Sequence, residues 1–360
     1  MTNVFIDKTL EKIYQSIANH IHKARANILK SVNQEQVIAY WNVGKNIVEQ
    51  EQLGESRAGY GKALLENLSQ RLNQEFGKGF GVTNLKYMRQ FYLTYQDRIS
   101  HKPCGESVTP EFSPNLSWSH YRILMRETRL ESRNFYEVEA ADNYWSVPQL
   151  QRQMDSFLFD RLSASKDEQS VLALANKGHV IEKAEDSLKD PVILEFLGYK
   201  EHHTYTETDL ESAIINHLQE FLLEMGKGFA FIGRQKRITI EGDHFYPDLI
   251  FYHTILKSYV IIDLKINKLT HGDVGQMQMY VNYYDRDIKQ NDDNPTIGLL
   301  LCAEKNDAVV KYTLPENNKQ IFSRKYQLHL PTIEQLKEEV KREYQEAKML
   351  LEKEKEPKAP

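Results

Sequence analysis

The stretch YPDLIFYHTILKSYVIIDLKI, residues 246–266, decides the fold of the C-terminal half of this 360-residue chain. It holds two runs of β-branched, aromatic and other apolar residues, which predict two β-strands on either side of a turn at residues 254–257. A symmetric hairpin about this turn pairs Tyr252 with Tyr259, and in the same register Asp248 faces Asp263. The sequence therefore predicts an antiparallel hairpin that brings two carboxylates face to face.

Asp263 stands in an otherwise apolar strand, where a carboxylate is costly to bury without a partner. Side chains alternate along a strand, so Lys265 lies on the same face. Opposed residues have Cβ atoms about 4.5–5.5 Å apart, and two like charges at that distance repel each other. A divalent cation between Asp248 and Asp263 would turn this repulsion into binding energy. The alternative is a structural salt bridge, in which Lys265 neutralises both carboxylates.

Hydrolysis of a phosphodiester with the help of a metal needs an ion, carboxylates that hold it and a fixed positive charge beside the phosphate. Asp248, Asp263 and Lys265 are residues of these types. Mg²⁺, with Mn²⁺ as a substitute, is the expected ion because it takes one or two carboxylates and keeps waters and substrate phosphate. The two cysteines, Cys104 and Cys302, indicate neither a disulfide framework nor a zinc site. No small-molecule cofactor is indicated.

The residues around the hairpin complete an α/β pattern. A helix is predicted from about residue 209 to 225, and the run GFAFIGRQKRITIEG, residues 228–242, is rich in strand formers. Another helix is predicted over residues 273–285, before the strand TIGLLLC at residues 296–302. The order αβββαβ predicts a mixed sheet of the restriction-endonuclease-like kind.

The N-terminal half predicts an all-α domain. Apolar residues recur every three to four positions over residues 6–53, which predicts two long helices, and over residues 62–76, which predicts a third. The turn GKGFG, residues 77–81, separates the third from a helix that ends near residue 95. This arrangement resembles a helix-turn-helix, in which Lys86 and Arg89 would contact DNA phosphates. Packing within a helical bundle is the competing interpretation.

The composition is that of a water-soluble chain. Hydrophobic residues make up 41% and charged residues 27%, and no apolar run approaches the roughly 20 residues of a membrane helix. The N-terminus lacks the continuous apolar core of a signal peptide, so we expect a cytoplasmic protein without membrane contact. The net charge of −5 means that a nucleic acid must bind to local basic patches.

Several segments beyond the carboxylate motif resemble the bacterial YhcG-like family of proteins assigned to the PD-(D/E)XK nucleases. In the C-terminal half they are FLLEMGKGFAFIGRQKRITIEGDHFYPDLIFYH at 221–253, VIIDLKINKL at 260–269 and GQMQMYVNYYD at 275–285. In the N-terminal half they are YWNVGKNI at 40–47, YGKALLENLSQRLNQEFGKGFGVTNLKYMRQFY at 60–92, LSWSHYRILMR at 116–126 and YWSVPQLQRQMDS at 144–156. Asp263 stands where this family usually has glutamate, and the superfamily accepts either carboxylate.

The resemblance implies further site residues. Glu211 matches an acidic residue that many members of the superfamily use as an additional metal or water ligand; an exposed acid near a helix N-terminus, favoured by the helix dipole, is the alternative. The backbone carbonyl of Leu264 is implied as a metal ligand. Gln276 and Tyr280 resemble a helix motif beside the active site, for which core packing is the alternative. Arg234 and Gln235 belong to a basic run that would contact nucleic acid, or that is simply solvated at an edge strand.

These observations predict three segments and one preferred function. Residues 1–185 would form a helical domain that binds DNA or a partner, residues 186–335 a nuclease domain, and residues 336–360 a charged helix that is solvated or contacts a second copy. The preferred function is cleavage of phosphodiester bonds in DNA with Mg²⁺. A catalytically silent DNA-binding or assembly factor and an RNA-cleaving toxin or defence component are the alternatives.

Overall fold

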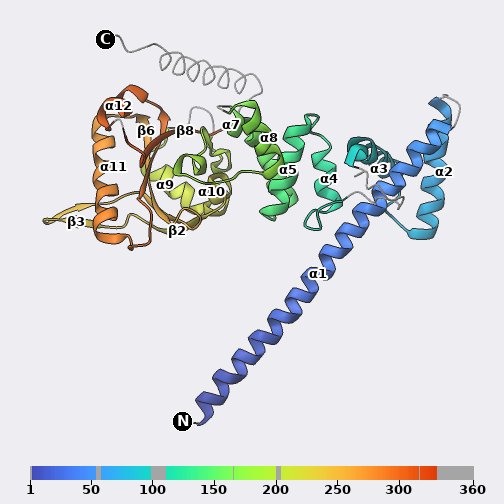
Figure 1. Cartoon of the computed structure of the whole chain (residues 1–360), viewed down its shortest axis with the longest axis horizontal. Helices are drawn as coiled ribbons and strands as arrows, with labels where there is room; N and C mark the ends of the chain where they lie inside the picture. The colour runs from blue at the N-terminus through green and yellow to red at the C-terminus, as the bar shows by residue number, and fades with distance from the viewer. Residues whose placement is uncertain are drawn as a thin grey trace. The chain divides into compact units, whose positions relative to one another are not determined.

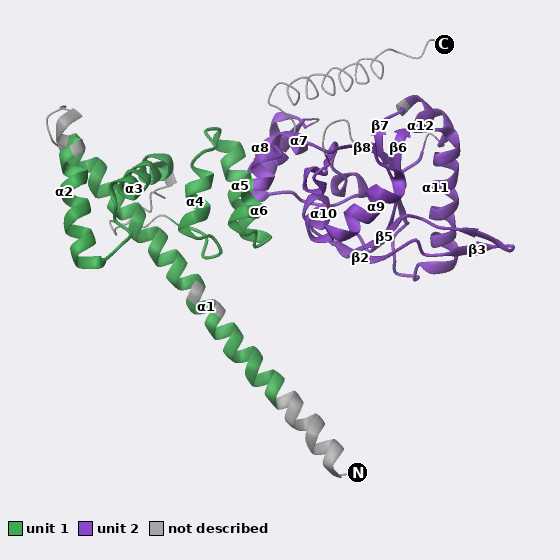
Figure 2. Ribbon diagram, turned by 180° about the vertical axis from the view of Figure 1, so that it is seen from behind, with its two compact units in different colours: residues 1–151 green, residues 152–360 purple. Residues whose placement is uncertain are grey.

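The chain divides into two compact units, residues 1–151 and 152–360, in the computed structural model (Figures 1 and 2). The structure describes residues 2–53, 58–98, 111–164, 166–199, 204–315 and 317–330. The predicted charged helix at residues 336–360 lies outside the described residues. No helix within the described ranges is long and apolar enough to cross a membrane.

The described part of the first unit is helical. It consists of α1 (Thr2–Leu53), α2 (Ala58–Phe76), α3 (Val82–Tyr95), a 3-10 turn (Gln96–Arg98), α4 (Trp118–Leu124), α5 (Leu130–Asp142) and the start of α6 (Val147–Asp155). The prediction of two helices over residues 6–53 was wrong, because α1 runs through without a break. The sequence of α1 contains no glycine or proline before Gly44 that would interrupt the helix. Gly44 does not interrupt the helix, and α3 packs so closely on it that a Cβ there would lie 2.0 Å from the carbonyl oxygen of Met88.

Aromatic side chains fill the core of the first unit. Phe91 of α3 is fully buried, and its ring centroid lies 5.0 to 5.3 Å from those of Phe112, Trp118 and Tyr121. Edge and tilted contacts at such distances are favourable between aromatic rings. These aromatic residues therefore serve core packing.

The helices of the second unit that come before β2 (Phe229–Arg234) have the short strand β1 (Val192–Ile193) among them. They are the end of α6, then α7 (Leu158–Ser163), α8 (Glu168–Lys177), α9 (Glu207–Asn216) and α10 (Leu218–Met225), with 3-10 turns at Ala184–Ser187 and Glu195–Leu197. The helix predicted over residues 209–225 is thus two helices, which meet at His217.

A buried ion cluster ties α6 and α7 to α10 within this unit. Glu224 of α10 has a side chain that is 0% exposed, and it lies 2.6 Å from Arg161 and 3.2 Å from Arg152. Burial alone would raise the pKa of Glu224, but the nearby cations outweigh it and lower the pKa to about 2. Glu224 is therefore ionised, and its charge is balanced by groups from neighbouring elements.

The main sheet of the second unit is mixed, as the sequence predicts. In the described part of the chain it has six strands in the order β1-β8-β7-β6-β5-β2. The strands are β1 (Val192–Ile193), β2 (Phe229–Arg234), β5 (Leu249–His253), β6 (Ser258–Lys268), β7 (Ile297–Glu304) and β8 (Ile321–Gln327). The β2–β5 and β5–β6 pairs are antiparallel, whereas β6–β7, β7–β8 and β1–β8 are parallel. A separate hairpin is formed by β3 (Ile238–Ile240) and β4 (Asp243–Phe245).

The predicted β5–β6 hairpin is confirmed. Tyr252 pairs with Tyr259, and the turn falls at residues 254–257. The last pair of the ladder is Leu249 with Ile262, so the next residues in the same register are Asp248 and Asp263. The turn therefore sets the relation between the two carboxylates.

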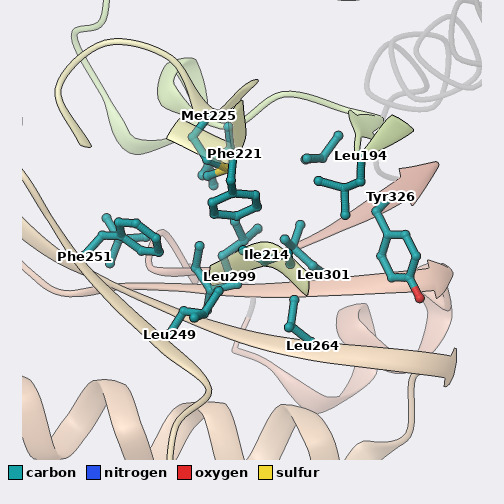
Figure 3. Close-up of a cluster of buried hydrophobic side chains, with 14 of the residues drawn as sticks. Leu194, Ile214, Phe221, Met225, Leu249, Phe251, Leu264, Leu299, Leu301 and Tyr326 are labelled. Atoms are coloured by element: carbon teal, nitrogen blue, oxygen red, sulfur yellow. The ribbon is translucent and has the colours of Figure 1, made fainter. Parts of the chain in front are cut away.

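The two faces of the sheet bury different clusters of apolar side chains. Leu249, Leu264 and Leu299 pack with Ile214 of α9 and Phe221 of α10 on one face (Figure 3). On the other face, residues of β5, β6 and β7 pack against α11 (His271–Tyr283). Figure 1 shows α9 and α10 on one side of the strands and α11 on the other. A π-helical turn (Tyr284–Ile288) follows α11, and α12 (Asp307–Thr313) follows β7.

Candidate active site

Asp248 and Asp263 lie on the α11 face of the sheet. Because side chains alternate along a strand, Ile250 lies on the same face as Asp248, and Ile261 on the same face as Asp263. Both isoleucines belong to the cluster packed against α11. Asp263 is only 2% exposed, and Asp248 is partly buried. Oδ2 of Asp248 accepts a hydrogen bond of 2.8 Å from the backbone N–H of Leu264, which holds this carboxylate against β6. The hairpin thus places both acids beside each other at the end of the β5–β6 ladder.

Burial and mutual repulsion make these carboxylates difficult to ionise. Burial, and after it the charge of Asp248, raise the pKa of Asp263 to about 7, although Lys265 opposes the shift. Burial also raises the pKa of Asp248, against the hydrogen bond from Leu264. A cation bound between the two acids would relieve this repulsion, and it would be bound most tightly where both are ionised.

Lys265 is the cation beside the acid pair. Its Nζ lies 2.8 Å from Oδ2 of Asp263 and 3.6 Å from Oε2 of Glu207, and its side chain is 15% exposed. Burial disfavours its charged form, but Asp263 and Glu207 outweigh burial and raise the pKa of Lys265. Lys265 therefore carries a positive charge beside the acid pair.

Gln235 joins Asp248 to Glu211. Its Nε2 donates to Oδ1 of Asp248 at 3.0 Å and to Oε2 of Glu211 at 2.9 Å. Gln235 directly follows β2, with φ +46° in the left-handed region, and its backbone N–H donates to the carbonyl of Asp248. Such strain in a non-glycine residue persists only where the surroundings hold it. One amide thus brings two of the predicted metal ligands together.

Glu211 is buried on α9, at 5% exposure. Its Oε1 has no hydrogen-bond partner among the described residues, and Nε of Arg234 approaches it only to 3.7 Å. Arg234 itself is half exposed. A buried carboxylate oxygen without a donor is costly, and a cation would satisfy it.

Gln276 and Tyr280 form a pair on α11. Nε2 of Gln276 donates to the hydroxyl of Tyr280 at 2.6 Å, and Tyr280 is fully buried. Burial raises the pKa of Tyr280, Gln276 opposes the shift, and the charges of Asp263 and Asp248 add to it. The pair therefore lies close enough to Asp248 and Asp263 for their charges to act on Tyr280. Tyr280 is also part of the apolar cluster between α11 and the sheet.

The remaining candidates differ in their surroundings. Leu264 points its side chain into the opposite core cluster, and its N–H is used by Asp248, while the role of its carbonyl stays a prediction. Lys86 on α3 is exposed. Arg89, one turn along, lies 2.6 Å from Glu51 of α1 and so is engaged in an ion pair within the first unit.

Two acids of the site were not foreseen. Glu207 lies one helical turn before Glu211 on α9, so the spacing of four residues was a signal that both occupy one face. Oδ1 of Asp273 lies 4.0 Å from Lys265, while its Oδ2 accepts from Thr270 in the capping box of α11. A capping residue has a sufficient local role, and for that reason the sequence alone did not indicate a second one.

The donor set suits a hard cation. Five carboxylates gather here against the two cations Lys265 and Arg234: Glu207, Glu211, Asp248, Asp263 and Asp273. In the ranges that the structure describes, no group of three or more His, Cys, Asp or Glu side chains is arranged so that it could hold a metal ion by itself. Mg²⁺ does not need one, because it is bound by one or two carboxylates together with waters and phosphate. The residues therefore fit this ion.

Comparison with known proteins agrees with this fold and motif. The family model described as "YhcG PDDEXK nuclease domain" matches residues 185–341, and the one described as "DUF1016 N-terminal domain" matches residues 16–161. The chain is 35% identical over 353 residues to "Putative nuclease YhcG" of Escherichia coli (strain K12). The aligned region covers 92% of this chain and 94% of that protein.

A solved structure, "crystal structure of a repair endonuclease from Pyrococcus abyssi", shares 19% identity and has a TM-score of 0.25. It covers 37% of this chain, and this chain spans 50% of that one.

The matched model, the mixed sheet and the Pro-Asp and Asp-x-Lys pattern define the C-terminal unit as a PDDEXK nuclease domain. The N-terminal region is the helical domain of the DUF1016 type. With 35% identity over nearly the whole length of its relative, the chain belongs to the YhcG family.

Proposed function

We propose that this protein is a nuclease that hydrolyses phosphodiester bonds in DNA with Mg²⁺ bound at Asp248 and Asp263. The observation that carries the proposal is the buried acid pair with Lys265 at 2.8 Å from Asp263. Two repelling carboxylates beside a fixed cation are unfavourable as a purely structural feature. They are the parts that hydrolysis of a phosphodiester with a metal requires.

Each residue has a distinct role in this proposal. Asp248, Asp263, Glu211 and the carbonyl of Leu264 hold the ion, which when bound supplies charge stabilisation and an activated water. Lys265 stabilises the charge that develops on the phosphate oxygens, because it stays protonated in this environment. Gln235 holds Asp248 and Glu211 in place.

Substrate contacts follow from the groups around the acids. Gln276 is only partly buried and can hydrogen-bond a phosphate oxygen, while the fully buried Tyr280 accepts a hydrogen bond from it and holds it in place. Arg234 is half exposed beside Glu211 and can pair with a neighbouring phosphate. DNA is proposed as the substrate, and the helical domain, with Lys86 exposed on α3, as an additional contact.

The test is cleavage by the full chain of circular DNA, linear DNA, single-stranded DNA and RNA, with and without Mg²⁺ or Mn²⁺, at stated salt. Asp248→Asn should abolish cleavage while the fold is kept, because it removes charge from the ion site with almost no change in volume. The matched control is Asp292→Asn, whose side chain is 80% exposed in the loop before β7. Cleavage by Asp248→Asn at the wild-type rate would refute the assignment.

The alternatives predict different results in the same assay. A catalytically silent assembly factor would bind DNA but would cut none of the substrates with either ion. An RNA-cleaving toxin or defence component would cut RNA and leave DNA intact.

A further inference from the structure

The N-terminal half of α1 presents a row of exposed apolar side chains. Five of them lie between residues 14 and 32 and are 48 to 65% exposed: Tyr14, Ile17, Ile21, Ile28 and Val32. In both views, this half of α1 extends beyond the other helices of the first unit (Figures 1 and 2). The C-terminal half of the same helix behaves differently, because Val37, Trp41 and Ile47 are buried.

The row has the spacing of a coiled-coil seam. Tyr14, Ile17, Ile21, Ala24 and Ile28 follow one another at intervals of three, four, three and four residues. This spacing places them in one narrow stripe along the helix, as at the a and d positions of a heptad repeat. We call the exposed residues 14, 17, 21, 24, 28 and 32 the α1 stripe. A helix that stands free in water with such a stripe is stabilised mainly by packing against a partner.

The charges of this segment indicate what kind of partner fits. Residues 14–34 contain no acidic residue and three basic ones, Lys23, Arg25 and Lys30. At about 100° per residue, Lys23 and Lys30 lie on the side opposite to the stripe, and only Arg25 borders it. A helix that binds an anionic lipid surface or an acidic helix carries basic residues along the edges of its apolar face. The α1 stripe has only Arg25 at its edge, so its charges do not favour either of these partners.

The other positions beside the stripe are uncharged. Ala18, His20 and Asn27 flank it, so two copies of the stripe can meet with little repulsion. The small Ala24 allows two helices to approach closely at that level. A second stripe of the same spacing is the surface that complements this one.

We infer that α1 pairs with α1 of a second copy of this chain through the α1 stripe, in a two-stranded coiled coil. The interface buries the isoleucines that are exposed in the single chain, leaves Lys23 in solvent and does not involve Lys30, which lies over the ring of Tyr144. This inference does not rest on the proposed nuclease activity. If both hold, each particle carries two nuclease domains.

The test is the mass of the full chain in solution, measured by light scattering over a range of concentrations. The expected mass is twice that of the 42.1 kDa chain. The double variant Ile21→Asp, Ile28→Asp places charge in the seam and should weaken the dimer by at least about 100-fold, since each isoleucine loses its apolar burial in both copies. The control Ser16→Asp, Asn19→Asp adds the same charge on the opposite side and should leave the dimer intact.

A second measurement keeps the inference falsifiable if the seam variant misfolds. Ile21→Cys in a Cys104→Ser background should form a disulfide-linked dimer on mild oxidation, whereas Asn19→Cys should not. The inference is overturned if the wild type has the mass of one chain at every concentration. It is equally overturned if a folded seam variant, checked by circular dichroism, remains a dimer.

Discussion

Replacing Asp263 with asparagine should stabilise the metal-free protein at alkaline pH while it abolishes cleavage. The substitution keeps the shape of the side chain and removes one of two repelling buried charges. Lys265 does not lose all its partners, because Glu207 at 3.6 Å and Asp273 at 4.0 Å remain. Stability and activity should therefore change in opposite directions.

The size of the effect follows from the pKa of Asp263. This pKa rises from 3.8 to about 7 on folding, a difference of about 3 units, which corresponds to ~4 kcal/mol at 1.36 kcal/mol per unit. Because the pKa of Asp263 is raised in the folded state, its contribution to the stability of the fold is fully present below the unfolded-state pKa. This contribution is lost as the pH rises through about 7, where Asp263 ionises in the folded protein. Asp263→Asn removes this loss, so its gain should appear near pH 8 and vanish towards pH 4.

The assay should report on the second unit alone, since two units need not unfold together. Hydrogen exchange of β5 and β6 amides, followed by mass spectrometry without metal at several pH values, gives the local free energy of opening. Asp292→Asn, an exposed aspartate before β7, is the matched control and should show no such change.

The opposite outcome would decide for the rival interpretation. If Asp263→Asn destabilises β6 near pH 8, the ion pair with Lys265 stabilises the fold on balance, and the acids form a structural salt bridge. The repulsion argument would then be wrong. If Mg²⁺ also protects wild type and variant equally, these acids do not hold the ion.

Lys265→Ala should lower turnover by about 100-fold or more and keep Mn²⁺ affinity, because the lysine acts on the transition state; calorimetry showing lost affinity would contradict this. Lys86→Ala with Arg89→Ala should weaken DNA binding and flatten its salt dependence in anisotropy measurements, whereas unchanged binding would remove α3 from the interface. Arg161→Met should destabilise the second unit by about 3–5 kcal/mol in thermal unfolding, since Glu224 loses a partner at 2.6 Å; a loss below about 1 kcal/mol would show that the remaining cations suffice.

Local patterns were enough for much of the nuclease domain. The turn at residues 254–257 and the alternation of apolar residues specify the β5–β6 register, because a slip of one residue would turn every core side chain to the other face. The same alternation put Asp263 and Leu264 on opposite faces of the sheet.

Local patterns failed where several conformations satisfy the same spacing. Periodicity over residues 6–53 fits one helix or two, and the structure has one, α1. Likewise, the apolar spacing of residues 209–225 does not show that the chain breaks at His217. Element boundaries depend on neighbours that are distant in the sequence.

The sequence by itself determined the class of domain and the mixed character of its sheet, through the order of its elements and its resemblance to a family. It also determined the hairpin that sets Asp248 against Asp263, since a hairpin depends on contacts between residues close along the chain. The pairing of β1 with β8, which joins Val192 to Tyr326, is not fixed by such local contacts. Only the tertiary structure showed that Gln235 joins Asp248 to Glu211 and that Glu207 reaches Lys265. It also paired Arg89 with Glu51, 38 residues earlier in the chain. Such contacts form between side chains of separate elements, whose distances are fixed by the packing of helices on the sheet and on one another and not by spacing along the chain.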